Sequence, residues 1–363
     1  MADLFALTAE LVDIPSESFA ESALVDRIET ELRDLAHLEL TRVGDNVVAR
    51  TTLGRPTRLV LAGHTDTVPA VDGNQVARVE GDTLWGVGSA DMKGGLAVML
   101  EAARRHVEPA VDVTYVFYAR EEVASVHNGL GELFDLRPDL LVGDLALLGE
   151  PTDGAIEAGC QGSIRMRVSI RGRRSHVARA WMGRNAIQRS GELLVALDRY
   201  ESRQPEIDGC RYREAVQVVE IDGGVSGNVV PDLVTLLVAH RFAPDRSASE
   251  AEAFLHELLR AHLEAGDSIE VVEVAPAAAP SLAHPLLSTI IRRHALPVRA
   301  KLGWTDVARF AQHGMPAANF GPGDPEIAHT PDERVERDSI ERTWEVLDDL
   351  LLRGADETIA GRP

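Results

Sequence analysis

The chain has 363 residues, of which 45% are hydrophobic, 26% charged and 4% aromatic, a composition typical of a globular protein with an apolar core. Its 58 acidic and 37 basic residues give a formal net charge of −21, which argues against nucleic-acid or anionic-lipid partners because the protein's field repels phosphate. No run of about 18–20 apolar residues predicts a membrane span, and the N-terminus has no basic region followed by an apolar run, so no signal peptide is expected. Only Cys160 and Cys210 are present, which excludes a disulfide framework and favours a cytoplasmic location.

The first 161 residues alternate between predicted helices and strands. Ser18–Glu21 has the form of a capping box, and the apolar residues that follow at helical spacing predict a helix. Short apolar or β-branched runs predict three strands, at 58–62, 111–119 and 145–148, and a helix is predicted at 92–106. This alternation is typical of an α/β fold with a mostly parallel sheet covered by helices.

The middle of the chain shows a different pattern. Strands are predicted at 164–170, 216–221, 234–241 and 269–274, with helices at 185–200 and 248–265. The order β-α-β-β-α-β is that of a ferredoxin-like split unit. We therefore expect an inserted α+β domain at 162–277 and a larger α/β domain formed by 1–161 and 278–363, which ends in helices near 286–294, 306–313 and 340–352.

Five segments place acidic or histidine residues directly after predicted strands, at the start of a helix, or in a loop rich in proline. They are 63–66 (GHTD), 89–95 (SADMKGG), 120–122 (REE), 148–152 (LGEPT) and 327–331 (IAHTP). In an open α/β sheet the carboxyl ends of the strands line the crevice where ligands bind, so one site could collect these segments. Taken singly, each has an ordinary structural explanation, such as a helix N-cap for Asp91 or a solvated strand end for Glu121 and Glu122.

Taken together, two histidines and three carboxylates suffice to hold two divalent ions that share one aspartate. Mixed nitrogen and oxygen ligands favour zinc or a neighbouring transition metal. Two such ions about 3.5–4 Å apart can hold a hydroxide and polarise a carbonyl, while one further carboxylate acts as proton shuttle. Adjacent Glu121 and Glu122 supply one base and one ligand, and Asp66, two residues after His64, can orient its imidazole.

Over essentially the whole chain these motifs resemble the dimetal aminoacylase, carboxypeptidase G and desuccinylase family of metallopeptidases. The resemblance implies two divalent ions, Zn²⁺ above all with Co²⁺ as an alternative, and assigns their ligands: His64, Asp91 and Glu150 for one ion, and Asp91, Glu122 and His329 for the other. It makes Asp66 the residue that orients His64 and Glu121 the general acid/base. A cis peptide between Asp91 and Met92 is also implied.

The resemblance extends to the inserted domain. It implies that His176 of the SHVA segment reaches the active site of a partner subunit and stabilises the oxyanion, so that the inserted domain pairs two copies into a homodimer. Asn228 of GNVVP and Arg241 of AHRF match positions that bind the carboxylate end of the substrate, and Thr305, close to Arg309, matches the acyl pocket. Because the net charge opposes an anionic substrate, we expect Arg241, with its fixed fork, to recognise a carboxylate.

Within the family the chain most resembles the actinobacterial branch that hydrolyses N-succinyl-LL-2,6-diaminopimelate to succinate and LL-2,6-diaminopimelate, a step towards lysine and cell-wall peptide. Two departures bear on the acyl group: Cys160-Gln161-Gly162 stands where many such enzymes have R-R-G, and Trp304 precedes Thr305. Deacetylation of N-acetylornithine, hydrolysis of dipeptides, and a catalytically inactive dimeric binding protein remain as alternatives. A panel of these substrates distinguishes them.

Overall fold

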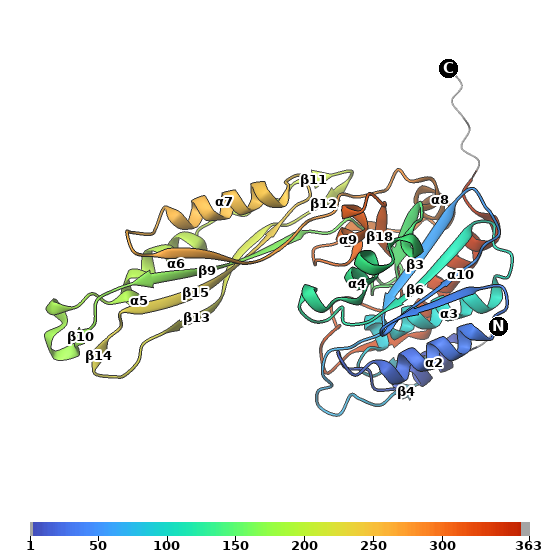
Figure 1. The fold of residues 1–363 in the computed structure, drawn as a ribbon, viewed down its shortest axis with the longest axis horizontal. Coiled ribbons are helices and arrows are strands. Elements are labelled where there is room, and N and C mark those ends of the chain that lie inside the picture. The colour runs from blue at the N-terminus through green and yellow to red at the C-terminus, as the bar shows by residue number, and fades with distance from the viewer. Residues whose placement is uncertain (1–2, 357–363) are drawn as a thin grey trace, which may run out of the picture. The chain divides into compact units, whose positions relative to one another are not determined.

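The computed structural model describes residues 3–356, which divide into two compact units (Figure 1). Unit 1 contains Met1–Ala158, Pro280–Arg299 and Arg309–Pro363, and unit 2 contains Gly159–Ala279 and Ala300–Ala308. Unit 2 thus takes in the segment expected as an insertion and, in addition, residues 300–308. That either unit is an independent domain stays a prediction.

An eight-stranded sheet in the order β1-β2-β6-β3-β7-β18-β8-β17 runs through unit 1. Its strands are β1 (Glu39–Val43), β2 (Asn46–Arg50), β3 (Arg58–His64), β6 (Asp112–Tyr118), β7 (Leu145–Leu148), β8 (Ile156–Ala158), β17 (Val298–Ala300) and β18 (Ala317–Asn319). The central strands β6, β3, β7 and β18 are parallel and almost wholly buried, which is why they read as continuous apolar runs in the sequence. The prediction of a mostly parallel centre is confirmed.

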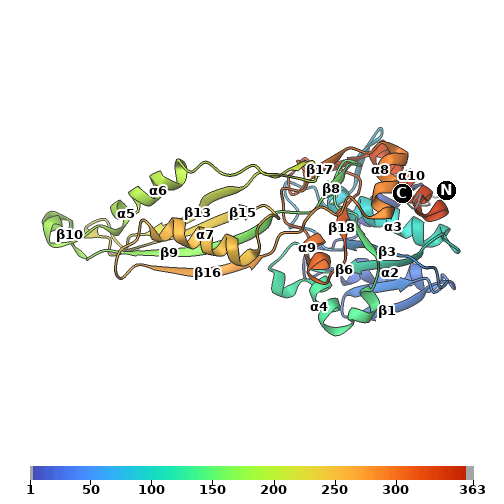
Figure 2. The same cartoon turned by 90° about the horizontal axis from the view of Figure 1, so that it is seen from above.

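The helices outside residues 159–279 are α1 (Leu4–Val12), α2 (Ser22–Arg33), α3 (Gly94–Arg105), α4 (Gly129–Leu136), α8 (Pro285–His294), α9 (Val307–Gln312) and α10 (Arg337–Arg353). Helix α3 lies against β3 and β6, and α10 packs between α3 and α8 (Figure 2). A small second sheet has the order β19-β5-β4, formed by β4 (Arg78–Glu80), β5 (Thr83–Trp85) and β19 (Arg334–Glu336). A turn, η1 (Ser89–Lys93), in which Asp91 and Met92 have non-helical dihedral angles, leads into α3, so the helix predicted from residue 92 begins two residues later.

The predicted capping box at Ser18–Glu21 is wrong. Helix α2 begins at Ser22, and its N-cap residue Glu21 makes no side-chain capping hydrogen bond. The Ser18 hydroxyl instead donates to Asp66 Oδ2 at 2.7 Å. A long-range polar contact has taken the hydroxyl that local capping would have used.

Unit 2 is built on a four-stranded antiparallel sheet in the order β13-β15-β9-β16. Its strands are β9 (Gly162–Arg171), β13 (Ala215–Gly223), β15 (Leu233–Phe242) and β16 (Ser268–Ala275), and its helices are α5 (Ala186–Arg189), α6 (Gly191–Asp198) and α7 (Ala248–Arg260). The chain order confirms the predicted ferredoxin-like pattern, although the helix expected at 185–200 is divided at Ser190. Two-residue strands form two further antiparallel pairs: β10 (Ser175–His176) with β14 (Val229–Val230), and β11 (Glu206–Ile207) with β12 (Cys210–Arg211).

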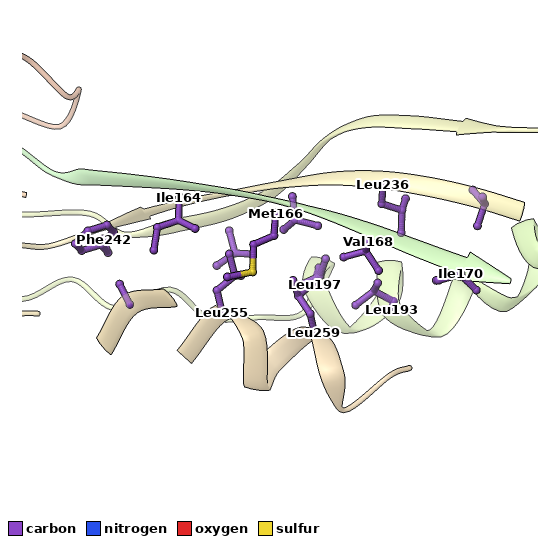
Figure 3. Close-up of a cluster of buried hydrophobic side chains, with 14 of the residues drawn as sticks. Ile164, Met166, Val168, Ile170, Leu193, Leu197, Leu236, Phe242, Leu255 and Leu259 are labelled. Atoms are coloured by element: carbon purple, nitrogen blue, oxygen red, sulfur yellow. The ribbon is translucent and has the colours of Figure 1, made fainter. Parts of the chain in front are cut away.

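The core of unit 2 lies between one face of this sheet and helices α6 and α7 (Figure 3). Alternate residues of β9, among them Ile164, Met166 and Val168, meet Leu193 of α6 and Leu255 of α7. The period of two explains why the same strand carries arginines on its other face. Among residues 3–356, none of the helices combines the length and apolar character needed to cross a bilayer.

Candidate metal centre

The carboxyl ends of three adjacent parallel strands bring the predicted residues together. The register pairs His64 of β3 with Tyr118 of β6, and Ala62 of β3 with Leu148 of β7. His64 is the last residue of β3, Glu121 and Glu122 follow β6, and Glu150 follows β7. Side chains from 64, 121–122 and 150 therefore emerge at one edge of the sheet, as the strand-end argument predicts.

Two turns deliver the remaining candidates. Asp91 lies in η1, and the peptide between Asp91 and Met92 is cis, as the family resemblance implies. The first turn of α3 can approach the end of β7 because residue 95 is glycine: a Cβ there would lie 2.3 Å from the carbonyl oxygen of Gly149. His329 comes from the loop before β19 and has a φ of 62°, a conformation that is uncommon outside glycine and is often found at functional sites.

Asp91 lies between the two histidines. Its Oδ1 is 3.0 Å from His64 Nε2, and its Oδ2 is 3.3 Å from His329 Nε2. His329 Nε2 is also 2.8 Å from Glu122 Oε1. Potential ligand atoms lie within 4.8 Å of one another in three groups: His64, Asp91 and Glu150; Asp91, Glu122 and His329; and His64, Glu121 and Glu122. The first two groups have the composition of the two expected ligand sets.

The ring of His64 is held with Nε2 facing Asp91. Its Nδ1 lies 3.0 Å from the backbone carbonyl oxygen of Asp66, which can only accept, and 3.6 Å from the Asp66 carboxylate. Nδ1 therefore carries a proton, and in the neutral ring Nε2 offers its lone pair towards Asp91, the tautomer that a metal ligand needs. The carbonyl of Asp66 makes this shorter contact, whereas the sequence had suggested its carboxylate.

The Asp66 carboxylate instead holds the loop that follows β6. Oδ1 accepts the N–H of Glu121 at 2.9 Å, and Oδ2 accepts the N–H of Glu122 at 3.1 Å as well as the Ser18 hydroxyl. Burial acts to raise the pKa of Asp66, but its partners His64 and Ser18 and the Glu121 N–H outweigh burial and lower that pKa. A charged, fully buried carboxylate thus fixes the backbone of Glu121 and Glu122.

The electrostatics of the cluster favour positive charge. Burial acts to lower the pKa of His64, but the carboxylates of Asp66 and Asp91 outweigh it and raise that pKa well above its ordinary value. Hydrogen bonds to Asp91 and Glu122 raise the pKa of His329 to about 10. Although burial opposes its charge, Asp91 has a lowered pKa because both histidines face it. A divalent ion that displaces these protons would supply the same positive charge.

These residues fit two divalent ions. Each group offers one imidazole nitrogen and at least two carboxylates, and Asp91 presents a separate oxygen to each histidine. Such mixed nitrogen and oxygen sites suit zinc and its neighbours. The assignment of individual ligands stays a prediction.

Sequence reasoning missed Glu333, which lies four residues after His329. Its Oε1 accepts the N–H of Ala90 at 3.1 Å and the N–H of Asp91 at 3.0 Å. Burial raises its pKa to about 7. In the sequence Glu333 is marked only by its position four residues after His329, and that position does not reveal the contact with Asp91.

The other predicted site residues belong to unit 2. His176 of β10 and Asn228, just before β14, are neighbours: Val177 N–H donates to the carbonyl oxygen of Asn228 at 3.0 Å. Nδ1 of His176 accepts the N–H of Ala178 at 3.0 Å, so the proton of the neutral ring resides on Nε2, which can donate. The Asn228 Oδ1 accepts a hydrogen bond from the Ser226 hydroxyl, so the Nδ2 donor of this amide points away from Ser226.

Arg241 and Thr305 both lie beside Cys160. The Cys160 thiol contacts the carbonyl oxygen of Thr305 at 3.8 Å, and Arg241 lies close enough to Cys160 for an electrostatic interaction. Burial lowers the pKa of Arg241. Within residues 3–356 the buried Thr305 Oγ1 and Gln161 Nε2 have no hydrogen-bond partner, a state that is costly unless a ligand or water completes it. The sequence marked the position of Gln161 as a departure from the R-R-G segment, but it did not reveal that this amide nitrogen is buried without a partner among the described residues.

Comparison with known families identifies the chain. Residues 60–353 match the model of Peptidase family M20/M25/M40. The chain belongs to this family. The family resemblance drawn from the motifs is thus confirmed. Members of M20 include a structure described as a dinuclear metal-binding peptidase, the Bacillus subtilis YXEP protein, with a TM-score of 0.68, 17% identity and 96% of each chain covered.

Two curated relatives are similar over nearly their whole length. A Corynebacterium glutamicum protein named succinyl-diaminopimelate desuccinylase is 43% identical over 359 residues, which cover 97% of this chain and 96% of that protein. A Mycobacterium tuberculosis protein, to which the name succinyl-diaminopimelate desuccinylase DapE is provisionally given, is 48% identical over 334 residues, 92% and 93% of the two chains.

The solved structures establish the fold. A tripeptidase from Staphylococcus aureus superposes with a TM-score of 0.79 at 21% identity and covers 96% of both chains. Its identity is too low to carry substrate across. The predicted fold class, an α/β sheet with an inserted α+β unit, is confirmed.

Proposed function

We propose that this M20 metallopeptidase hydrolyses the amide of N-succinyl-LL-2,6-diaminopimelate to succinate and LL-2,6-diaminopimelate. The observation that carries the proposal is the 43% identity over 97% of the chain to a relative named for that reaction. It is supported by a site with every side chain that amide hydrolysis on two metal ions needs. We assign the reaction to the cytoplasm, since both cysteines are buried and free, as a reducing compartment allows.

The proton transfers fall to Glu121. Two bound ions, Zn²⁺ or in its place Co²⁺, would supply Lewis acidity that lowers the pKa of water and polarises the amide carbonyl. Glu121 takes a proton from the attacking water and passes it to the leaving nitrogen. The C–N bond breaks, hydroxyl ends on the succinyl carbon and hydrogen on the amine. His64, Asp91, Glu122, Glu150 and His329 would hold the ions, and Asp66 holds the backbone of Glu121.

His176 acts as a hydrogen-bond donor to the oxyanion. Its Nε2–H tautomer, fixed by the Ala178 N–H, is the donor form, and its side chain is exposed. We propose that it serves the active site of a partner copy, with Asn228 beside it binding the same substrate. Donors aimed at a developing oxyanion contribute about 10²–10³ in rate.

A homodimer through unit 2 supplies that partner. Strand β13 is an edge strand and exposes Val219 and Ile221 by 57% and 52%. Helix α6, which contacts β13, adds exposed Val195 to the same edge. An exposed apolar edge is a template for strand pairing, and two copies of β13 related by a twofold axis would bury it. The opposite edge strand, β16, also exposes valines, at 271, 272 and 274, but by smaller fractions of 41%, 44% and 38%, and helix α7 contacts it.

Substrate carboxylates are recognised by Arg241, with Thr305 and Gln161 as neutral donors. The three lie close to Cys160, and the buried Thr305 Oγ1 and Gln161 Nε2 have no hydrogen-bond partner among residues 3–356. A buried donor set of this kind favours an anionic group over a methyl group. These donors would bind the succinyl carboxylate in place of the arginine of the R-R-G segment, which this chain lacks.

The experiment is a substrate panel with metal-loaded protein. N-succinyl-LL-2,6-diaminopimelate is compared with its N-acetyl counterpart, which differs only in the acyl group, and with N-acetylornithine and a dipeptide. We expect the highest kcat/KM for the succinyl substrate. Faster turnover of N-acetylornithine or of the dipeptide would replace the proposed substrate, and no turnover of any would favour a binding protein.

Two variants with matched controls test the assignments. Glu121→Gln is expected to lower kcat by about 10²–10⁴ with unchanged metal content, whereas Glu132→Gln, a carboxylate bound to Arg120 and Asn46, leaves kcat unchanged. Arg241→Met removes charge-assisted hydrogen bonds of about 1.5–3 kcal/mol, a loss of about 10- to 150-fold in kcat/KM for the succinyl substrate. Arg167→Met, which breaks an ion pair with Glu270 on the same sheet, is the control. Full activity of Glu121→Gln would refute the base assignment.

A further inference from the structure

Glu333 is a buried carboxylate that the proposed mechanism does not use. Its exposed fraction is 1%. Its Oε1 accepts two consecutive backbone N–H groups, those of Ala90 and Asp91, at 3.1 and 3.0 Å. One oxygen therefore satisfies both peptide donors in the turn that carries the shared aspartate, donors that would otherwise be buried without an acceptor.

The backbone around Glu333 is tied to the same turn. Its carbonyl oxygen accepts the N–H of Gly86 at 3.1 Å. Its own N–H donates to the carbonyl oxygen of Thr330, in the same segment, at 3.2 Å. The next residue, Arg334, pairs with Trp85 in the β19–β5 ladder. The chain from His329 to Glu333 and the chain from Trp85 to Asp91 are thus joined by main-chain hydrogen bonds as well as by the carboxylate.

This arrangement matters because of what Asp91 does. Its two oxygens face the two histidine Nε2 atoms at 3.0 and 3.3 Å. A rotation of the Asp91 backbone would move both oxygens at once. Whatever fixes the peptide N–H of Asp91 therefore also fixes the positions at which two ions could share its carboxylate.

We infer that Glu333 is a positioning residue: it clamps the peptide of Asp91 and so sets the spacing of the two ions, without touching ion or substrate. The inference rests on the two-ion centre of the proposed function and adds to it the residue that orients the shared ligand. Partners that hold metal ligands typically contribute 10- to 100-fold in metal affinity or activity.

Two substitutions separate the effect of the length of the Glu333 side chain from the effect of its charge. Glu333→Gln keeps the length and an acceptor oxygen but removes the charge. Glu333→Asp keeps the charge but shortens the side chain by one carbon–carbon bond, about 1.5 Å, which withdraws the oxygen from hydrogen-bonding distance. If geometry is what counts, Gln behaves as the wild type and Asp is impaired.

The measurement is binding of Co²⁺ to the metal-free proteins, followed by calorimetry and by the visible absorption of the bound ion, alongside kcat and KM. For Glu333→Asp we expect affinity for the second ion to fall about 10- to 100-fold, an altered absorption spectrum, and a lower kcat with little change in KM. Thermal unfolding of the metal-free proteins records separately any loss caused by removing the charge near Lys93 in Glu333→Gln.

Asp112→Ala is the matched control for a purely structural role. Asp112 is also buried and also accepts two backbone N–H groups, those of Leu53 and Arg55, but it begins β6 at the end of the strand away from Glu121. It should lose stability and keep wild-type Co²⁺ affinity and spectrum. The inference is overturned if Glu333→Asp binds two ions as the wild type does, or if Glu333→Gln is impaired as strongly as Glu333→Asp. A wild-type protein that binds no Co²⁺ overturns the metal centre itself, and this inference with it.

Discussion

Replacing Asp66 by alanine tests whether its carboxylate organises the turn that presents Glu121 and Glu122. The side chain is fully buried. Its oxygens accept the N–H of Glu121, the N–H of Glu122 and the hydroxyl of Ser18. Alanine leaves two partly buried backbone donors without an acceptor, and it releases the loop that carries the proposed base.

The size of the effect follows from these contacts. A buried donor without an acceptor costs about 1–3 kcal/mol, so Asp66→Ala should lower the free energy of unfolding by about 2–6 kcal/mol. Ser18→Ala removes one donor and leaves the carboxylate two others, so a loss of about 0.5–1.5 kcal/mol is expected. Asp66→Asn should fall between them, because its amide nitrogen must face at least one backbone N–H.

Urea unfolding at neutral pH measures the stability, and turnover at saturating Co²⁺ measures the positioning. We expect kcat of Asp66→Ala to fall about 10- to 100-fold and that of Ser18→Ala to fall less. Asp112→Ala, with a similar loss of stability, should keep its kcat. Wild-type kcat in Asp66→Ala, or a loss of stability no larger than that of Ser18→Ala, would show that the carboxylate does not hold this loop.

Three further predictions concern pH, metal and assembly. Burial acts to raise the pKa of Asp112, but hydrogen bonds from Thr51 and two backbone N–H groups outweigh burial and lower that pKa. Since the folded pKa lies below the unfolded one, Asp112→Asn should be less stable than the wild type by about 1–3 kcal/mol at neutral pH. Urea unfolding should show this difference in stability decrease as the pH falls through the lowered pKa. A chelator should abolish turnover and lower the Tm, because the clustered carboxylates lose their counter-charge, and Zn²⁺ or Co²⁺ should restore both; turnover that survives chelation contradicts the two-ion centre. Ile221→Glu on the β13 edge should give monomers by light scattering and a lower kcat, because His176 loses its partner site, while Val272→Glu on the β16 edge should stay dimeric; a fully active monomer contradicts the shared site.

The centre of the fold could be predicted because burial on both faces leaves a plain mark on a sequence. Strands β3 and β6 are almost wholly buried, so their apolar runs could belong only to an internal element. The capping box at Ser18 failed because the pattern describes local chemistry alone. A hydroxyl can satisfy a nearby helix end or a distant carboxylate, and here Asp66, 48 residues away, has it.

The proposed ligands could be predicted because the topology of the sheet brings them together. Parallel strands end at one edge, so residues after β3, β6 and β7 must meet there. Glu333 could not be found in this way. Its partners are backbone N–H groups 243 and 242 residues away, and every residue type has such a group, so no side-chain pattern marks the contact. The Gln161 amide nitrogen, which has no hydrogen-bond partner in the described part of the chain, was missed for a related reason, because only its burial makes it notable.

Asp66 and Glu333 make the same kind of contact, and their positions in the chain show the effect of that contact. Each carboxylate accepts two consecutive backbone N–H groups next to a proposed ligand. Asp66 belongs to the segment of His64 and holds the segment of Glu122, so it joins a proposed ligand of one ion to a proposed ligand of the other. Glu333 belongs to the segment of His329 and holds Asp91, the ligand that both ions would share in the proposed centre.

Neither clamp therefore strengthens one ligand set alone; each fixes the distance between the two sets. Carboxylates gathered this closely repel one another when no ion is bound, and a loop held only through its side chains would splay. Hydrogen bonds to the main chain resist that repulsion while leaving every ligand atom available. The spacing of the two ions is in this view a property of the folded backbone, settled before any metal arrives.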